Sequence, residues 1–219
     1  MTESAVSVIV ACRDRAALLA ASLPSLRATL RPGDELVVVD AASRSPAVAR
    51  VAEAAGAVVV RSTRPGASAA RNAGWRAARH DLLAFTDDDC RPAPTWLAEI
   101  ALALAALDAV CGRVEADGDG HLSVLEEPTA RTYHLDDDPA GFGHGANTGV
   151  RRSALESVDG WDERLGPGTR WPGGEDKDLV VRLLSSGCRV GYRPEPLVRH
   201  LQWRTRRQSL RAELGYAKG

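Results

Sequence analysis

The sequence predicts an α/β fold in which a mostly parallel central sheet is flanked by helices. Over residues 5–90, short apolar runs rich in β-branched residues alternate with helical segments, as expected of strands joined by crossover helices. Such crossovers are right-handed and bring the carboxyl ends of the strands to one edge of the sheet. Polar side chains follow several of these runs, at the edge where ligands bind in open α/β sheets.

The first half of the chain contains four expected strands and three expected helices. The expected strands are residues 5–11, 34–40, 57–61 and 81–86. The expected helices are residues 16–30, 45–56 and 66–79. Pro24 must kink or divide the first helix. The second helix has Ser45 as its cap, Pro46 at its first position and Gly56 past its end, which is the usual arrangement of these residue types.

The second half of the chain is less regular. A helix over residues 93–107 and a strand over residues 108–116 precede a polar, Gly-rich stretch, residues 117–147. We expect this stretch to be a long loop that could close over a ligand. A short strand and helix, a Gly/Pro/Trp-rich loop, an amphipathic helix, two short strands and a basic helix follow it, at residues 147–158, 160–174, 175–187, 188–194, 196–200 and 206–219.

Composition and charge are those of an ordinary soluble globular protein. The chain has 219 residues, 44% hydrophobic and 26% charged, and a formal net charge of -1, so no nucleic-acid partner is expected. The four cysteines are scattered without C-x-x-C pairs, as is typical of reduced cytosolic thiols. No 18-residue apolar run and no basic region before the first apolar run are present. We therefore expect a cytoplasmic protein without a transmembrane helix or signal peptide.

The C-terminal segment carries a local positive charge. From Arg199 to Gly219 it holds six Arg or Lys against one Glu, Glu213. Such a patch could contact phosphates, an anionic membrane surface or an acidic partner. A solvated helix face is the simpler alternative. Peripheral membrane contact is therefore an open expectation, and the sequence does not indicate an oligomeric state.

Three carboxylates, Asp87, Asp88 and Asp89, follow the fourth expected strand. Like charges side by side repel, so either water solvates them in a loop or a cation lies among them. Alternate residues of an extended segment point the same way, so Asp87 and Asp89 could face one ligand while Asp88 faces elsewhere. Mg²⁺ and Mn²⁺ prefer carboxylate oxygens and commonly share a site with substrate phosphates. The pattern therefore favours a metal bound to a diphosphate.

Four further side chains are candidates for the same site. Two glycines precede Glu175 and Asp176 at the expected start of a helix, where anionic carboxylates are favoured. Aimed into a cleft, such a carboxylate can take a proton from an attacking hydroxyl; helix stabilisation alone is the alternative. Arg71 could reach a nucleotide phosphate or base, or pair with a neighbouring carboxylate. His200 follows a late strand and could be a third metal ligand, or an ordinary core or surface histidine.

Other side chains give weaker indications. Trp161, Trp171 and Trp203 lie in or near the Gly-rich loops, where their rings could stack on a sugar or pack into the core. His121, His134 and His144 lie in the long loop and are weaker metal-ligand candidates than His200.

These stretches together resemble family-2 glycosyltransferases of the GT-A fold. "RPGASAARNAGWRAARHDLLAFTDDDC" is similar to the most recognisable block of that family, which runs from a helix to a D-x-D motif. Four other blocks resemble, in family order, its opening strand and helix, its nucleotide-binding second strand, its acceptor-side block and its E-D helix. They are "VSVIVACRDRAALLAASLPSL", "ELVVVDAAS", "NTGVRRSALESVDGWDERL" and "GGEDKDLVVRLLSSG".

On the donor side, the resemblance implies roles in nucleotide binding. Asp40 would contact the base or ribose, with Ala11 and Arg13 beside it. Arg71 would support the base or the diphosphate, and Asp87 and Asp88 would belong to the same nucleotide-binding group. Residues 40–43 read "DAAS" where the family usually has "D-D-G-S".

For metal binding and catalysis, the resemblance implies a division of roles among the remaining candidates. Asp87 and Asp89 would be the D-x-D pair, with Asp89 the firmer metal ligand. His200 would help to hold the metal or the diphosphate. Asp176 would be the general base, and Glu175 would bind the acceptor.

The resemblance implies one GT-A domain over residues 1–219, with a nucleotide-binding half (1–115), an acceptor-binding half (116–205) that adds a smaller sheet and loops, and the basic helix (206–219). It implies an inverting transferase that uses Mn²⁺ or Mg²⁺. The enzyme would move a sugar from a nucleotide-diphosphate sugar, UDP-sugar being the first choice, to a hydroxyl of a glycan, peptide, lipid-linked molecule or natural product. A catalytically inactive nucleotide- or sugar-binding homologue and a sugar nucleotidyltransferase remain alternatives. The latter would need a Gly-rich phosphate loop after the first strand, and "ACRDRAALL" has none.

Overall fold

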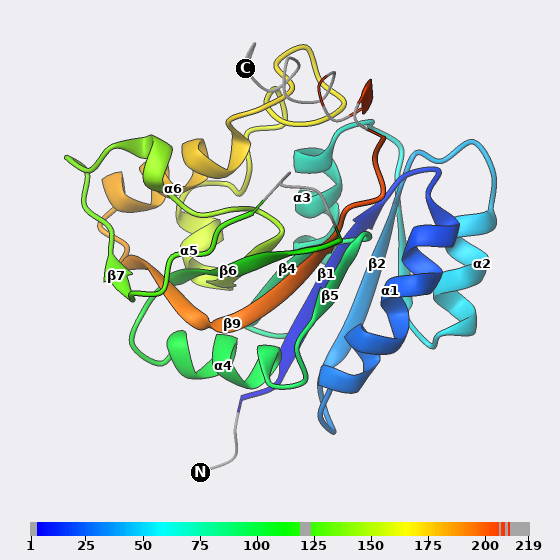
Figure 1. Cartoon of the computed structure of the whole chain (residues 1–219), viewed down its shortest axis with the longest axis horizontal. Coiled ribbons are helices and arrows are strands. Elements are labelled where there is room, and N and C mark those ends of the chain that lie inside the picture. Colours follow the sequence, from blue (N-terminus) through cyan, green and yellow to red (C-terminus); the bar gives the residue numbers. More distant parts are fainter. Residues whose placement is uncertain (1–3, 119–123, 206, 209, 211–219) are drawn as a thin grey trace.

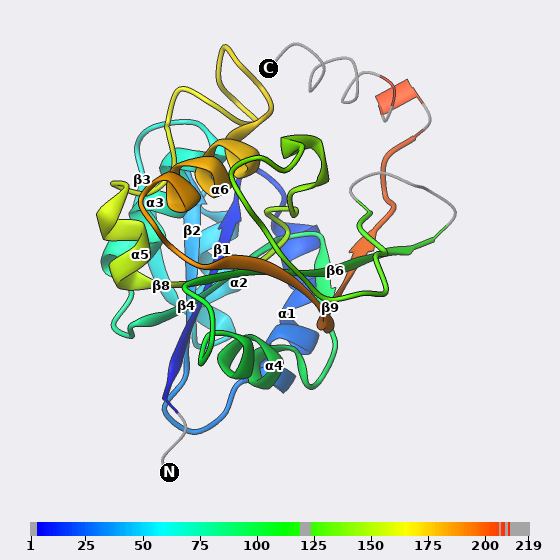
Figure 2. The same cartoon turned by 90° about the vertical axis from the view of Figure 1, so that its left-hand side faces the viewer.

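The computed structural model describes residues 4–118, 124–205, 207, 208 and 210. Its strands form one sheet in the order β3-β2-β1-β4-β8-β6-β9-β5, with β7 paired to β9. Helices cover both faces of this sheet (Figures 1 and 2). The predicted α/β fold is therefore confirmed, and the acceptor-side strands extend the central sheet instead of forming a second one.

The first half of the chain forms the parallel part of the sheet. Its strands are β1 (Val6–Cys12), β2 (Glu35–Ala41), β3 (Val58–Ser62) and β4 (Leu82–Asp87). Its helices are α1 (Ala16–Thr29), α2 (Ala47–Ala54) and α3 (Ala67–Ala77). Helix α1 continues through Pro24, so of the two predicted effects, a kink or a division of the helix, division is wrong. The buried face of α1, which includes Leu19, Leu23 and Leu26, packs on the sheet and stabilises both sides of the proline.

Two apolar clusters lie on the two faces of the sheet. On one face, Val8 and Val10 of β1 pack with α1, α2 and α4 (Trp96–Ala103). On the other face, Ile9 packs with α3, α5 (Arg152–Ser157) and α6 (Glu175–Ser185). Because β1 and β2 are buried on both faces, their sequences are continuous apolar runs instead of alternating ones.

The second half of the chain adds antiparallel strands and one further parallel pair. These strands are β5 (Cys90–Pro92), β6 (Ala109–Asp117), β7 (Arg131–Thr132), β8 (Asn147–Arg151) and β9 (Val190–Leu201). The expected long loop over residues 117–147 also contains β7 and a 3₁₀ turn, η1 (Pro139–Gly141). The short strand β5 was not predicted.

The two short strands predicted over residues 188–200 are one strand, β9. Its register against β6 jumps between Gly112 and Arg113, which pair with Arg193 and Leu197 respectively. Pro194 and Pro196 fall within this jump, where their lack of an N–H group removes no ladder hydrogen bond. The strand therefore tolerates two prolines that, in the sequence, look like a break.

Two expectations concern the C-terminal helix and helices that could span a membrane. The basic helix predicted over residues 206–219 lies largely outside the described residues and stays a prediction. Among the described residues, no helix combines the length and the apolar character needed to cross a bilayer.

Candidate active site

A cavity of about 660 Å³ lies at the carboxyl ends of β1 and β4. Its walls also include the segment before β8, the start of α6 and the end of β9, so both halves of the chain contribute. Volumes of this size suit a small-molecule ligand. Of the residues predicted from the sequence, Ala11, Arg13, Arg71, Asp87, Asp89, Glu175, Asp176 and His200 line the cavity, whereas Asp40 and Asp88 do not.

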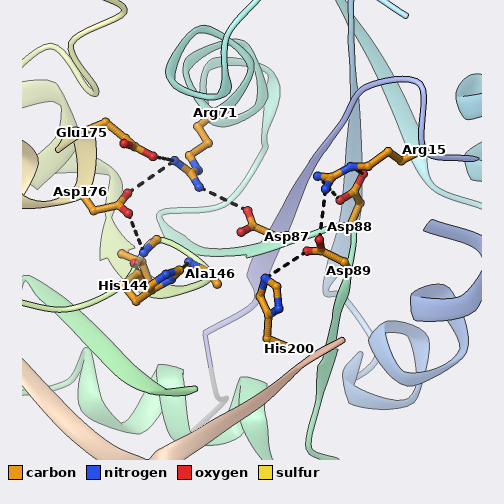
Figure 3. Close-up of polar contacts among 12 residues, drawn as sticks. Arg15, Arg71, Asp87, Asp88, Asp89, His144, Ala146, Glu175, Asp176 and His200 are labelled. Carbon is orange, nitrogen blue, oxygen red and sulfur yellow. Dashed lines mark hydrogen bonds and ion pairs between the residues drawn. The ribbon is translucent and has the colours of Figure 1, made fainter. Parts of the chain in front are cut away.

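One wall brings Asp87, Asp89 and His200 together (Figure 3). Possible ligand atoms of these three residues and of Cys90 lie within 4.8 Å of one another. Asp89 is buried, and its Oδ2 accepts hydrogen bonds from Arg15 Nη1 at 3.1 Å and from Trp203 Nε1 at 2.7 Å. Its Oδ1 accepts no hydrogen bond and lies 3.5 Å from His200 Nε2.

These residues fit a divalent cation. A buried carboxylate oxygen without a donor costs free energy that a bound cation would offset. Two carboxylates and an imidazole are suitable ligands for Mn²⁺, and the carboxylates also suit Mg²⁺. Cys90 is fully buried, and a thiol is a soft ligand that Mg²⁺ and Mn²⁺ do not favour. The candidate metal ligands are therefore Asp87, Asp89 and His200.

Asp88 faces away from the cavity. Arg15 Nε donates to its Oδ2 at 3.0 Å, and Ser22 Oγ donates to its main-chain oxygen, also at 3.0 Å. Burial raises the pKa of Asp88 to about 7, against the opposing effect of Arg15. Asp88 thus ties the turn after β4 to α1 and to the segment before it, and its assignment to nucleotide binding stays a prediction.

Arg71 of α3 lies among three carboxylates (Figure 3). Its Nη1 is 3.2 Å from Glu175 Oε1 and 3.5 Å from Asp176 Oδ1, and its Nη2 is 3.3 Å from Asp87 Oδ1. Only 5% of the residue is exposed. Arg71 therefore pairs with carboxylates, the alternative that the sequence left open, and joins the end of β4 to the start of α6.

Glu175 and Asp176 begin helix α6. The preceding Gly174 has a φ of 81°, a conformation that favours glycine. Asp176 Oδ2 accepts the main-chain N–H of Gly145 at 2.9 Å, and a side chain at position 145 would collide with that carboxylate. The side chain of Asp176 is 24% exposed and that of Glu175 is 8% exposed. Asp176 is therefore the more accessible of the two carboxylates.

Burial and the neighbouring charge of Asp176 raise the pKa of Glu175 to about 7, although Arg71 opposes this shift. Glu175 can therefore be protonated near neutral pH, in which case it can donate a hydrogen bond. Glu175 is thus the less exposed of the two adjacent carboxyl groups and one that can take up a proton near neutral pH.

Asp40 is 1% exposed at the end of β2. Its Oδ1 accepts the N–H of Ser43 at 2.9 Å, and its Oδ2 accepts from Arg61 Nη1 at 2.7 Å. Ala42 lies where family-2 glycosyltransferases usually have glycine, and its φ is 58°. The turn at Ala42 brings the chain back onto Asp40. The predicted contact of Asp40 with a nucleotide therefore stays a prediction, whereas Ala11 and Arg13 do line the cavity.

Several residues that line the cavity were predicted from the sequence only weakly or not at all. Arg15, His144, Lys177 and Arg204 all line the cavity. His144 Nδ1 accepts the N–H of Ala146 at 3.1 Å, and burial lowers the pKa of His144. The glycines of "GFGHGAN" are the local signal that this segment passes close to other groups, since a Cβ at Gly143 would collide with Cys111.

The three tryptophans named above have different environments. Trp161 is 3% exposed and packs edge-on against Phe85, with ring centroids 4.6 Å apart, so it belongs to the core. Trp171 is 46% exposed and does not line the cavity. Trp203 donates to Asp89.

The architecture is that of the GT-A fold. A mannosyltransferase, PcManGT, from Pyrobaculum calidifontis, solved with GDP-Man and Mn²⁺, superposes with a TM-score of 0.73 and 22% identity over 98% of this chain and 61% of that chain. TarS 1–349 of S. aureus, solved with UDP-GlcNAc, gives a TM-score of 0.74 and 18% identity over 94% and 60% of the two chains.

Sequence comparison identifies the family. Residues 7–159 match the model of glycosyl transferase family 2, and the chain belongs to this family. Two curated relatives, each named pre-mycofactocin glycosyltransferase, come from two strains of Mycobacterium tuberculosis. Each is 29% identical over 210 residues, which cover 89% of this chain and 42% of the relative. The chain thus spans less than half the length of these relatives.

Proposed function

We propose that this protein is an inverting glycosyltransferase. It transfers a sugar from a nucleotide-diphosphate sugar to an acceptor hydroxyl, with Mn²⁺ or Mg²⁺ as cofactor and Asp176 as the general base. UDP is the first nucleotide to test, but GDP-Man and UDP-GlcNAc are both bound by proteins of this fold, so the identity of the nucleotide needs a direct measurement. The names of the curated relatives support the reaction class.

One observation carries the proposal: two groups of carboxylates face the same cavity and share one guanidinium. Asp87 and Asp89 lie with His200 on one side, and Glu175 and Asp176 lie on the other. Arg71 contacts Asp87 and both α6 carboxylates. A donor diphosphate on the first side would therefore have its sugar near a carboxylate that is accessible from the cavity.

The first group would bind the metal. Asp87, Asp89 and His200 would hold the ion, with Oδ1 of Asp89 free to coordinate it. When bound, the ion would offset the negative charge on the diphosphate leaving group. Arg15 and Trp203 donate hydrogen bonds to the other oxygen of the Asp89 carboxylate, Oδ2.

The second group would move the proton. Asp176 would take the proton of the acceptor hydroxyl while that oxygen bonds to the anomeric carbon from the face opposite the diphosphate. The bond from the anomeric carbon to the diphosphate oxygen breaks, and the nucleoside diphosphate leaves with the electron pair. Because this is a single displacement, the anomeric configuration inverts. Glu175, which can be protonated near neutral pH, would bind the acceptor, in its protonated form as a hydrogen-bond donor.

Nucleotide binding is the first test. We would titrate UDP, GDP and dTDP calorimetrically, each with Mn²⁺ and with EDTA, into the wild type and Asp89→Ala. We expect one nucleotide to bind in the presence of metal, and this binding to be lost in Asp89→Ala. If folded wild-type protein binds none of the three with metal, the chain would be an inactive homologue or would bind another class of ligand.

The assignment of the general base needs a separate test. Asp176→Asn should keep metal-dependent nucleotide binding but slow hydrolysis of the corresponding sugar nucleotide, with water as the acceptor, on the order of 10²–10⁴-fold. Asp178→Asn is the matched control, because Asp178 lies on the same helix, pairs with Arg182 at 2.7 Å and does not line the cavity. An equal loss of rate in both variants would argue against Asp176 as the base.

A further inference from the structure

The segment that follows β9 is held against Asp89. The main-chain N–H of Leu201 donates to the main-chain oxygen of Asp89 at 2.8 Å. Two residues later, the indole Nε1 of Trp203 donates to the Oδ2 of the same aspartate at 2.7 Å. Both the backbone and the side chain of Asp89 are therefore fixed by residues more than a hundred positions away in the sequence.

Trp203 is itself held in place by arginines. The guanidinium carbon of Arg15 lies 5.7 Å from the centroid of the indole ring, and that of Arg204 lies 4.8 Å from it. Cations at these distances attract an aromatic ring. Arg15 also donates to Asp88 and to the same Oδ2 of Asp89. Trp203, Arg15 and Asp89 thus form one connected group, although 39% of Trp203 is exposed.

The consequence concerns how Asp89 presents its second oxygen. The terminal torsion of an aspartate is broad and nearly two-fold, so the side chain has little intrinsic preference for one orientation of its carboxylate. Two donors on Oδ2 fix that orientation and leave Oδ1, which accepts no hydrogen bond, 3.5 Å from His200 Nε2. Hydrogen bonds of this kind to a metal ligand orient it and tune its affinity for the ion.

We propose that Trp203 is a positioning residue for the metal: its indole N–H fixes the carboxylate of Asp89 so that Oδ1 points to the ion. This inference rests on the metal site of the proposed function. It assigns to Trp203 a role different from the sugar stacking that its place in the sequence suggests. The two roles are separable, because positioning needs the N–H group and stacking needs only the aromatic ring.

The variant Trp203→Phe keeps an aromatic ring and removes the N–H. Mn²⁺ would be titrated into each protein and the free aqua ion followed by electron paramagnetic resonance, with and without the nucleotide that binds. We expect Trp203→Phe to bind Mn²⁺ about tenfold more weakly than wild type, the lower end of what such outer partners contribute. Trp171→Phe, which replaces an exposed tryptophan outside the cavity, should bind as tightly as wild type.

The outcomes separate this inference from the proposed function. If wild type binds Mn²⁺ and Trp203→Phe binds it equally well, Trp203 has no positioning role, but the metal site stands. If wild type binds no Mn²⁺ under any of these conditions, the proposed metal site is wrong, and the positioning role of Trp203 is wrong with it.

A second measurement needs no variant. In ¹⁵N-labelled wild type, the Trp203 indole N–H should exchange with solvent more slowly than that of Trp171, and Mg²⁺ should shift its resonance more. Equal exchange and equal shifts for the two indoles would overturn the inference.

Discussion

Buried carboxylates lie at both ends of the parallel strands, and the two ends differ in how that charge is paired. At the amino end, Glu35 is 5% exposed and accepts from Ser7 Oγ at 2.6 Å, from the main-chain N–H of Arg79 at 2.5 Å and from Arg79 Nε at 2.9 Å. At the carboxyl end, the ion pairs among the described residues give five carboxylates two guanidinium groups, and one histidine that pairs with a carboxylate only when it is protonated. The carboxylates are Asp87, Asp88, Asp89, Glu175 and Asp176, and their partners are Arg15, Arg71 and His200.

The pKa values of two glutamates show the difference. Burial alone would raise the pKa of Glu35, but the hydrogen bonds from Ser7 and Arg79 outweigh it and lower the pKa. Burial beside Asp176 raises the pKa of Glu175 to about 7 despite Arg71. The amino end therefore stabilises the fold, whereas the carboxyl end keeps an excess of negative charge that a divalent cation would offset.

The largest expected effect on stability is that of Arg71→Met. It would leave Asp87, Glu175 and Asp176 without their shared cation, and removing one partner of a buried ion pair typically costs about 3–5 kcal/mol. Urea unfolding at pH 8 should show this loss. Arg76→Met is the control on the same helix, because Arg76 is 44% exposed and its ion pairs are at the surface, where such pairs contribute up to about 1 kcal/mol. Similar losses in the two variants would mean that the carboxylate cluster does not depend on Arg71.

Glu175→Gln should stabilise the protein, whereas Arg71→Met should destabilise it. Because folding raises the pKa of Glu175 from 4.5 to about 7, the folded state holds its proton to higher pH than the unfolded chain. The stability that the folded protein gains from binding this proton more tightly is fully present below pH 4.5 and is lost as the pH rises through about 7. The uncharged variant should therefore be more stable than wild type by roughly 1–3 kcal/mol above pH 8. This difference should disappear as the pH is lowered toward 5 in unfolding curves, and a variant less stable at every pH would contradict the expectation.

Glu35→Gln tests the other end of the sheet. Folding lowers the pKa of Glu35 below its ordinary value of 4.5, so its contribution is present above that pH and is lost as the pH falls through the lowered value. At pH 7 the variant should lose about 1–2 kcal/mol, since an amide cannot accept all of the hydrogen bonds that the carboxylate accepts. The difference from wild type should shrink below pH 4.5. As the pH rises, Glu175→Gln should thus become more stable than wild type, whereas Glu35→Gln should become less stable than wild type.

The sequence predicts the strands of the sheet better than it predicts the ion pairs and hydrogen bonds of these carboxylates. Strands β1 to β4 lie within a residue of the predicted positions, because a continuous apolar run is a local signal. The three-residue strand β5 is too short to have such a pattern, and the prolines of β9 look like a break although the register against β6 accommodates them.

The residues of the candidate site were mostly predictable, but their partners were not. Eight of the ten predicted residues line the cavity. Most of them lie at the end of a strand or the start of a helix at one edge of the sheet, and two, Ala11 and Arg13, were predicted only through the family resemblance. The hydrogen bonds of Asp89 to Arg15 and to Trp203 join residues 74 and 114 positions apart. No periodicity or spacing in one sequence indicates such a contact, since it arises only when the chain has folded.

The smallest expected effect is that of Arg79→Ala, which compares the exposed Arg79 at the amino end of the strands with the buried Arg71 at the carboxyl end. Arg79→Ala removes the guanidinium from Glu35 but keeps the main-chain N–H at position 79, and Ser7 Oγ still donates to the carboxylate. The side chain of Arg79 is 69% exposed, so its ion pair is screened by water and salt. We expect a loss of up to about 1 kcal/mol that shrinks further in 0.5 M NaCl, measured by urea unfolding beside Arg71→Met. A loss as large as that of Arg71→Met would mean that the exposed guanidinium, and not the hydrogen bonds from Ser7 and the main chain, stabilises the buried glutamate.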